Sequence, residues 1–171
     1  ASGRSLDVFA REEIFEPLGM SDTGFRPAPS VHGRVAPTET LGDGRVLRGV
    51  VHDPTSRQMG GVAGHAGLFS TADDLSRYAE MLLGGGMRAG VRLFSEESVA
   101  LMTRDQTPDG IVESRGIGWD IDSRFSGPRG RIFPLGSFGH TGWTGTSLWI
   151  DPASTSHVIF LSNRNHPTEA G

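Results

Sequence analysis

Lysine and cysteine are both absent from this sequence of 171 residues, and each absence excludes whole classes of functional site. All 16 basic residues are arginines, so neither a Walker-type phosphate loop nor a Schiff-base lysine can form within these residues. A Ser-x-x-Lys nucleophile pair is excluded for the same reason. Without cysteine there can be no disulfide and no thiolate metal site.

Runs of positive charge and long apolar runs are missing too. The net charge is −4, and no basic cluster offsets it, so we expect neither nucleic acid nor a membrane surface as a partner. No stretch approaches the roughly 20 apolar residues of a membrane span. The length suits one domain or part of a larger one, and hydrophobic residues make up 36%, enough for a core. No motif calls for a cofactor.

The first part of the chain predicts helices and loops. Residues 5–16 show helical spacing of apolar side chains, with Ser2 or Ser5 as N-cap, and Pro17 is expected to end the helix. Residues 26–61 contain four prolines and are expected to form a long irregular surface excursion, with a short hairpin around residues 42–44.

Two further helices have clear local signals. A helix capped by Ser70 or Thr71 should carry Asp73 and Asp74 in its first turn, where carboxylates suit the helix dipole, and should stop at residues 84–86, which are all glycine. A third helix is expected to start after Ser95. The single tyrosine, Tyr78, lies on the apolar face of the middle helix and is interpreted as a packing residue.

After residue 115 the pattern changes to strands, expected at residues 116–122, 138–142, 146–150 and 157–163. The last contains a continuous apolar run, which is typical of a strand buried on both faces. Short links between successive strands indicate an antiparallel meander. Helices followed by strands predict an α+β fold, an antiparallel sheet with flanking helices.

The segment most informative about chemistry is residues 138–147, in which glycines surround a His-Thr pair. A glycine within a strand often marks the close approach of a ligand or of another backbone. The alternative is a tight hairpin with a solvated histidine. A separate possibility is a metal site built from His52, Asp53 and His65, although such residues more often cap a turn. No close metal-ligand spacing occurs among the six histidines, so we expect no metal.

Five short segments, in order, resemble the serine β-lactamase and penicillin-binding-protein superfamily, in particular its class C β-lactamase-like hydrolases. His140-Thr141-Gly142 resembles the His-Thr-Gly variant of the Lys-Thr-Gly strand, found in some D-alanyl-D-alanine peptidases and esterase-like members. The other matching segments are residues 14–23, 64–75, 116–119 and 161–167.

The resemblance implies a partial β-lactamase/transpeptidase-like fold. Family members also carry a Ser-x-x-Lys and a Tyr-x-Asn or Tyr-x-Asp element, and neither is present. We therefore expect residues 1–171 to be the C-terminal portion of a single domain, with helices and loops mainly in 1–115 and antiparallel strands mainly in 116–167. A complementary N-terminal segment is expected as partner, and the chain alone is expected to be inactive. Family members are often periplasmic or secreted, although the sequence itself leaves the compartment open.

The resemblance also implies acyl transfer through a serine ester, on an ester, amide or β-lactam substrate. The N–H of Trp143 would be one oxyanion donor. A lysine at position 140 would be a fixed charge, whereas a histidine is mostly neutral at pH 7, which favours an esterase or peptidase. The implied catalytic residues are His140, Thr141, Gly142 and Trp143, and the implied substrate-binding residues are Thr144, Asn163 and Arg164. The alternative is a non-catalytic binding or structural module that reuses this half-domain.

Overall fold

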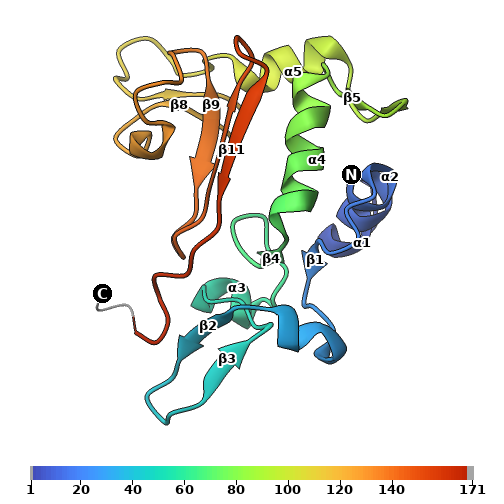
Figure 1. Ribbon diagram of the computed structural model, residues 1–171, viewed down its shortest axis with the longest axis vertical. Helices are drawn as coiled ribbons and strands as arrows, with labels where there is room; N and C mark the ends of the chain where they lie inside the picture. Colours follow the sequence, from blue (N-terminus) through green and yellow to red (C-terminus); the bar gives the residue numbers. More distant parts are fainter. Residues whose placement is uncertain (1, 169–171) are drawn as a thin grey trace. The chain divides into compact units, whose positions relative to one another are not determined.

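The computed structural model describes residues 2–168 and confirms the α+β class, with helices and one five-stranded antiparallel sheet (Figure 1). The chain divides into two compact units. One comprises residues 1–74 and 162–171, and the other comprises residues 75–161. No helix among the described residues is long and apolar enough to span a bilayer.

The first unit begins with a continuous helical segment that runs past the expected end at Pro17. Helix α1 (Leu6–Ala10) continues through a π-helical stretch (Arg11–Phe15) into α2 (Glu16–Leu18). Pro17 is tolerated because it lies in the first turn of α2, after the wider π-helical turn. The helix ends instead at Gly19, whose φ of 70° is left-handed.

Residues 26–61 contain regular elements, so the expectation of an irregular excursion was wrong. The hairpin was predicted correctly, and its turn is closed by the Gly44 N–H donating to the Leu41 carbonyl at 2.8 Å. Asp53 caps a short helix by accepting a 2.6 Å hydrogen bond from the Ser56 N–H. This region contains a 3-10 helix (Pro29–Arg34), β2 (Pro37–Thr40), β3 (Val46–Arg48) and α3 (Pro54–Gln58). It is flanked by β1 (Gly24–Phe25) and β4 (Leu68–Phe69), which pair with each other.

Two sequence segments of the resemblance meet at the buried carboxylate of Asp74. It accepts hydrogen bonds from the Asp22 N–H and the Thr23 hydroxyl, both at 2.8 Å. The Thr23 hydroxyl also lies 2.7 Å from the Ser70 hydroxyl. The Asp-Thr and Ser-Thr-Ala-Asp-Asp segments therefore have a structural role, since they join the turn after α2 to the start of the next helix.

Helices α4 (Ala72–Leu83) and α5 (Glu96–Thr103) have the predicted caps. The Thr71 hydroxyl accepts the Asp74 N–H at 3.2 Å, and the Ser95 hydroxyl accepts the Ser98 N–H at 3.1 Å. After Leu83 the glycine run stops α4 as expected, because Gly85 and Gly86 both have positive φ. A two-stranded hairpin, β5 (Met87–Arg88) and β6 (Val91–Arg92), connects the helices.

The second unit contains the predicted antiparallel meander, in the strand order β11-β10-β9-β8-β7. The strand expected at residues 116–122 is shorter, because Gly118 has a φ of 78° and residues 116–119 form the connection between two strands. The strands are β7 (Ser114–Arg115), β8 (Asp120–Asp122), β9 (Phe138–Thr141), β10 (Ser147–Asp151) and β11 (Ser156–Phe160), with a 3-10 helix (Gly127–Arg129) between β8 and β9.

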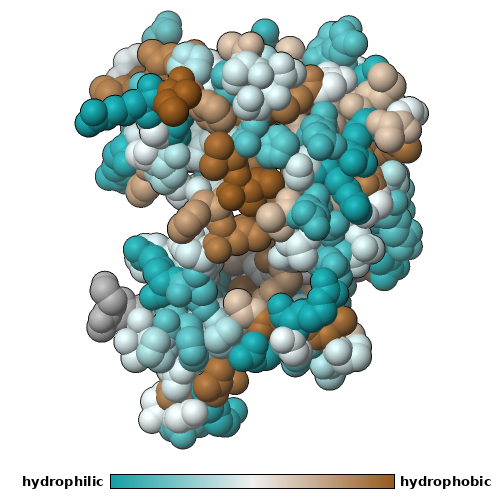
Figure 2. Space-filling view, viewed as in Figure 1, coloured by the Kyte–Doolittle hydropathy of each residue, from teal (hydrophilic) through white to brown (hydrophobic). Residues whose placement is uncertain are grey.

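Among the described residues, strand β11 lies at the edge of the sheet and pairs with β10 alone, whereas the sequence predicted burial on both faces. The side chains of Val158 and Phe160 are 54% and 60% exposed. Apolar surface is visible over this strand (Figure 2). A continuous apolar run in the sequence therefore does not show how many neighbouring strands pair with that segment.

Aromatic side chains from β9, from β10 and from the residue just before β8 are buried in the core of this unit. Trp149 and Phe138 are almost fully buried, and the Phe138 ring lies edge-on to Trp119 at 5.2 Å between centroids. Tyr78 on α4 stacks on Trp119 at 6.5 Å, and burial raises the pKa of its hydroxyl. Tyr78 is therefore a packing residue, as expected.

Candidate active site on the β9–β10 hairpin

The His-Thr-Gly segment lies at the end of β9 and leads directly into a tight turn. The Gly142 N–H donates to the Thr146 carbonyl at 2.7 Å, and the Gly145 N–H donates to the Gly142 carbonyl at 3.0 Å. Trp143 and Thr144 therefore occupy the two central positions of a four-residue turn, and Gly145 follows with a φ of 101°. Thr144 lies in this turn, between the two strands that the sequence predicted at residues 138–142 and 146–150.

Gly139, which precedes His140, has no side chain and so leaves space for the backbone and the aromatic ring of the neighbouring strand. Gly139 faces Trp149 across the hairpin, and a Cβ built on it would lie 2.4 Å from both the Leu148 carbonyl oxygen and a ring atom of Trp149. Gly142 has a milder constraint, because its added Cβ would meet the Thr146 hydroxyl. The close approach at Gly139 is therefore that of another backbone and an aromatic ring, one of the two alternatives open from sequence.

His140 is exposed and has two hydrogen-bond partners. Its Nδ1 lies 2.8 Å from the Thr141 carbonyl, which can only accept. Its Nε2 lies 3.3 Å from an Nη of Arg115, which can only donate. The two contacts agree on one arrangement, a neutral imidazole with its proton on Nδ1.

Arg115 is the site residue that the sequence interpretation missed. It ends β7, and its guanidinium also lies 5.9 Å from the centre of the Phe125 ring. A sequence signal was available, because Arg115 directly precedes the Gly-Ile-Gly-Trp segment that formed part of the resemblance. Only strand pairing, with β8 between β7 and β9, shows that it reaches His140.

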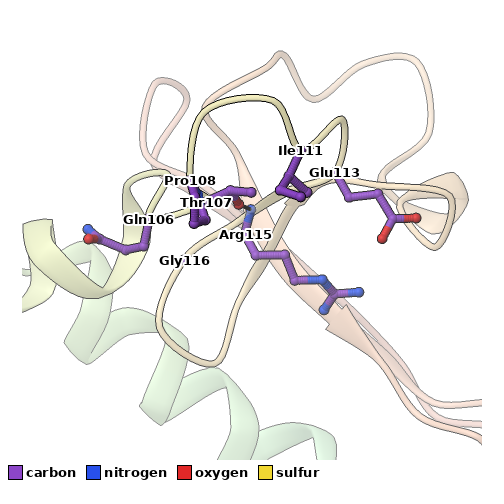
Figure 3. A pocket seen from close by; sticks show the side chains of 7 residues that line it. All are labelled: Gln106, Thr107, Pro108, Ile111, Glu113, Arg115 and Gly116. Atoms are coloured by element: carbon purple, nitrogen blue, oxygen red, sulfur yellow. Dashed lines mark hydrogen bonds between the residues drawn. The ribbon is translucent and has the colours of Figure 1, made fainter.

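An open cavity of about 370 Å³ lies beside Arg115. In Figure 3 the side chains of Arg115 and Glu113 both extend away from Gln106. Glu113 is paired with Arg124 at 3.4 Å, and the Arg124 guanidinium lies 4.9 Å from the Phe125 ring centre. The lining residues are Gln106, Thr107, Pro108, Ile111, Glu113, Arg115 and Gly116.

The remaining predicted site residues are distributed over both units. Trp143 is 67% exposed in its turn, and Thr144 beside it is half-buried. Asn163 and Arg164 belong to the unit that contains the N-terminal helix. The Asn163 amide donates to the Pro37 carbonyl, and its oxygen accepts the Asn165 N–H at 3.2 Å, so Asn163 organises the last described segment.

Two of the residues considered as possible metal ligands, His65 and Asp53, form a hydrogen-bonded pair at the start of α3. His65 Nε2 lies 3.0 Å from a carboxylate oxygen of Asp53, which also caps α3. The Ser56 N–H, followed by the His65 ring, lowers the pKa of Asp53. Within residues 2–168 no group of three or more histidine, aspartate or glutamate side chains is arranged to hold a metal ion.

Comparison with known proteins agrees with this architecture. The family model described as "Beta-lactamase" matches residues 1–171. A protein of Escherichia coli K12 named "Putative D-alanyl-D-alanine carboxypeptidase" is 34% identical over 184 residues, which cover 96% of this chain and 41% of that protein. The chain thus spans about two fifths of the length of this relative.

Solved structures share the fold at lower identity. A penicillin-binding protein homologue from Caulobacter crescentus has a TM-score of 0.65 at 22% identity, covering 94% of this chain and 47% of its own. A family VIII carboxylesterase has a TM-score of 0.65 at 19% identity, with 94% and 46% covered. The chain therefore belongs to the beta-lactamase family of the serine β-lactamase and penicillin-binding-protein superfamily, and it holds part of that domain.

Proposed function

We propose that this chain is the His-Thr-Gly part of a serine hydrolase that acts through an acyl-enzyme on ester, amide or β-lactam substrates. One observation carries the proposal: His140-Thr141-Gly142 lies at the end of β9, with the histidine exposed and the glycine leading into a tight turn. Membership of the family and its carboxypeptidase and esterase relatives support the reaction class.

The turn offers what an acyl-transfer site needs from this half of a domain. The N–H of Trp143 would be one oxyanion donor, and the other would be the N–H of the nucleophilic serine. A preorganised donor of this kind contributes about 10²- to 10³-fold in rate when present. Thr141 and Thr144 would hydrogen-bond the substrate. Gly142 has no side chain, so an extended substrate can lie against the strand.

The nucleophile and its base would come from residues outside 1–171, because a Ser-x-x-Lys pair needs a lysine and this sequence has none. We propose that the complementary segment completes one domain with residues 1–171. The neutral imidazole at position 140 favours an ester or peptide substrate over efficient β-lactam hydrolysis. The alternative remains a non-catalytic module that reuses the half-domain.

Covalent labelling tests this proposal. The protein encoded by the complete reading frame and the isolated chain of residues 1–171 are each incubated with a fluorescent penicillin and with a fluorophosphonate. We expect stoichiometric labelling of one serine in the complete protein and none in the isolated chain. A labelled serine within residues 1–171 would overturn the assignment of the nucleophile, and an unlabelled complete protein would favour the non-catalytic module.

A further inference from the structure

We infer that Arg115 is a positioning residue of the candidate active site, and that it acts through the ring of His140 and not by contact with the substrate. The ring holds the peptide group between Thr141 and Gly142, and Arg115 holds the ring. The inference rests on the proposed function for its kinetic readout. The geometry that motivates it involves this chain alone, because an Nη of Arg115 lies 3.3 Å from Nε2 of His140.

The peptide group between Thr141 and Gly142 is bound at both of its polar ends. Its carbonyl oxygen lies 2.8 Å from Nδ1 of His140, and its N–H donates to the Thr146 carbonyl at 2.7 Å. Because a peptide group is planar, hydrogen bonds on opposite edges fix the orientation of the whole plane. This plane directly precedes Trp143, whose N–H is the proposed oxyanion donor, so its orientation sets the direction of that donor.

The ring of His140 needs a second contact to stay in this orientation. His140 is exposed, and one hydrogen bond at Nδ1 leaves other side-chain rotamers accessible. Since the Thr141 carbonyl only accepts, the proton is on Nδ1, and Nε2 accepts from Arg115. Both nitrogens of the neutral ring are then engaged within the protein. In this arrangement His140 links Arg115 to the peptide group and is not the base of the reaction.

Arg115 is itself restrained at its backbone and at its guanidinium. Its N–H donates to the Thr107 hydroxyl at 2.8 Å, and its carbonyl accepts the Gln106 N–H at 2.7 Å. The pairing of β7 with β8 shifts register next to Arg115, and such a bulge re-aims a neighbouring side chain. The guanidinium lies 5.9 Å from the centre of the Phe125 ring, within the range of a cation–π contact. These contacts limit the directions that the guanidinium can take.

Nitrogen chemical shifts of the ring test this geometry without any substrate. In complete protein labelled with ¹⁵N-histidine, the His140 signal is identified by its loss in His140→Gln. We expect the neutral Nδ1–H tautomer in alkaline buffer. Arg115→Met removes the donor to Nε2 and should produce a mixture of tautomers, whereas Arg115→Lys keeps a donor and should retain most of the Nδ1–H form. An Nε2–H tautomer in wild type, or an unchanged signal in Arg115→Met, would refute the link.

Kinetics with a matched pair of esters distinguish positioning from substrate binding. Phenyl acetate is uncharged, and 3-carboxyphenyl acetate carries a carboxylate. A misdirected oxyanion donor impairs acyl transfer to any substrate, so Arg115→Met should lower kcat/KM about 3- to 30-fold for both esters, less than outright removal of a donor does. Arg115→Lys should recover most of the activity. A loss confined to the carboxylate ester would overturn the inference, because it would show that Arg115 contacts the substrate.

A double-variant cycle tests whether Arg115 acts through His140. His140→Gln keeps an acceptor for Arg115, so it should lose less activity than His140→Ala. Once His140→Ala has removed the ring, Arg115→Met should have little further effect, and additive losses would contradict the inference. Phe125→Leu should cause the same changes as Arg115→Met at smaller size. Arg131→Gln alters an exposed arginine of the same loop as Phe125 and should change neither the ring signal nor kcat/KM.

Failure of the proposed function would leave a different pattern. If the complete protein hydrolyses neither ester but the His140 signal responds to Arg115→Met as expected, the link between the two residues stands and the proposed reaction falls. If both esters are hydrolysed with unchanged kcat/KM in Arg115→Met, the reaction stands and the inference falls.

Discussion

Replacing Gly139 by alanine should destabilise the hairpin that carries the His-Thr-Gly segment. The new Cβ would lie 2.4 Å from the Leu148 carbonyl oxygen and 2.4 Å from a Trp149 ring atom, well inside van der Waals contact. Neither neighbour can move freely. The Leu148 carbonyl belongs to the backbone of β10, and Trp149 is 1% exposed within the core.

The size of the effect follows from these contacts. Overpacking a well-packed core costs about 1–3 kcal/mol, and we expect Gly139→Ala near the upper end because one of the two clashes is with backbone. Trp149→Leu removes the ring clash at a cost of its own, so the double variant should be less destabilised than the sum of the single variants by about 1 kcal/mol. That coupling would identify the ring as one source of the strain.

Urea unfolding of the complete protein, followed by circular dichroism, measures both quantities. Gly127→Ala is the matched control, because Gly127 belongs to the same unit, lacks a positive φ and has nothing within 4 Å of its added Cβ. It should change the free energy of unfolding by no more than about 0.5 kcal/mol. The reasoning fails if Gly139→Ala is as stable as the control, or if the effects of Gly139→Ala and Trp149→Leu are simply additive.

Two other predictions concern local stability. The pKa of Asp105 is lowered to about 2 by the hydroxyl of Ser114 and then by Thr107. The contribution of this carboxylate to the free energy of unfolding is therefore complete above the unfolded pKa near 3.8 and is lost as pH falls through about 2. Asp105→Asn should therefore show a smaller drop in unfolding free energy than wild type between pH 4 and pH 2, and equal drops would contradict this. Thr71→Ala removes the N-cap of α4 and should cost about 1 kcal/mol in urea unfolding, whereas Thr71→Ser should keep most of the stability.

Features encoded by a few consecutive residues were predicted well. The caps at Thr71 and Ser95, the glycine stop after α4 and the turn between β2 and β3 all depend on hydrogen bonds within about five residues. The end of the first helix was missed because a proline signal was applied without its context. Pro17 lies in the first turn of α2, where its missing N–H costs little.

Features that depend on partners distant in sequence were not predictable in this way. The apolar run of β11 has the composition of a buried strand, but only the order of strands shows that it lies at the edge of the sheet. The role of Gly139 was left open between a ligand and another backbone, and the register that places Trp149 opposite it decided the answer.

By itself the sequence determined the class of the fold, the family through its short motifs, and the absence of lysine chemistry, because each depends on residue identity or on local spacing. The tertiary structure alone decided which cation accompanies the His-Thr-Gly segment. Arg115 and His140 are 25 positions apart and meet because β7, β8 and β9 are adjacent strands of one sheet. Pairing between strands brings together residues that are far apart in the sequence, and no repeating pattern of residues marks such a pair. This contact therefore could not be predicted from the sequence.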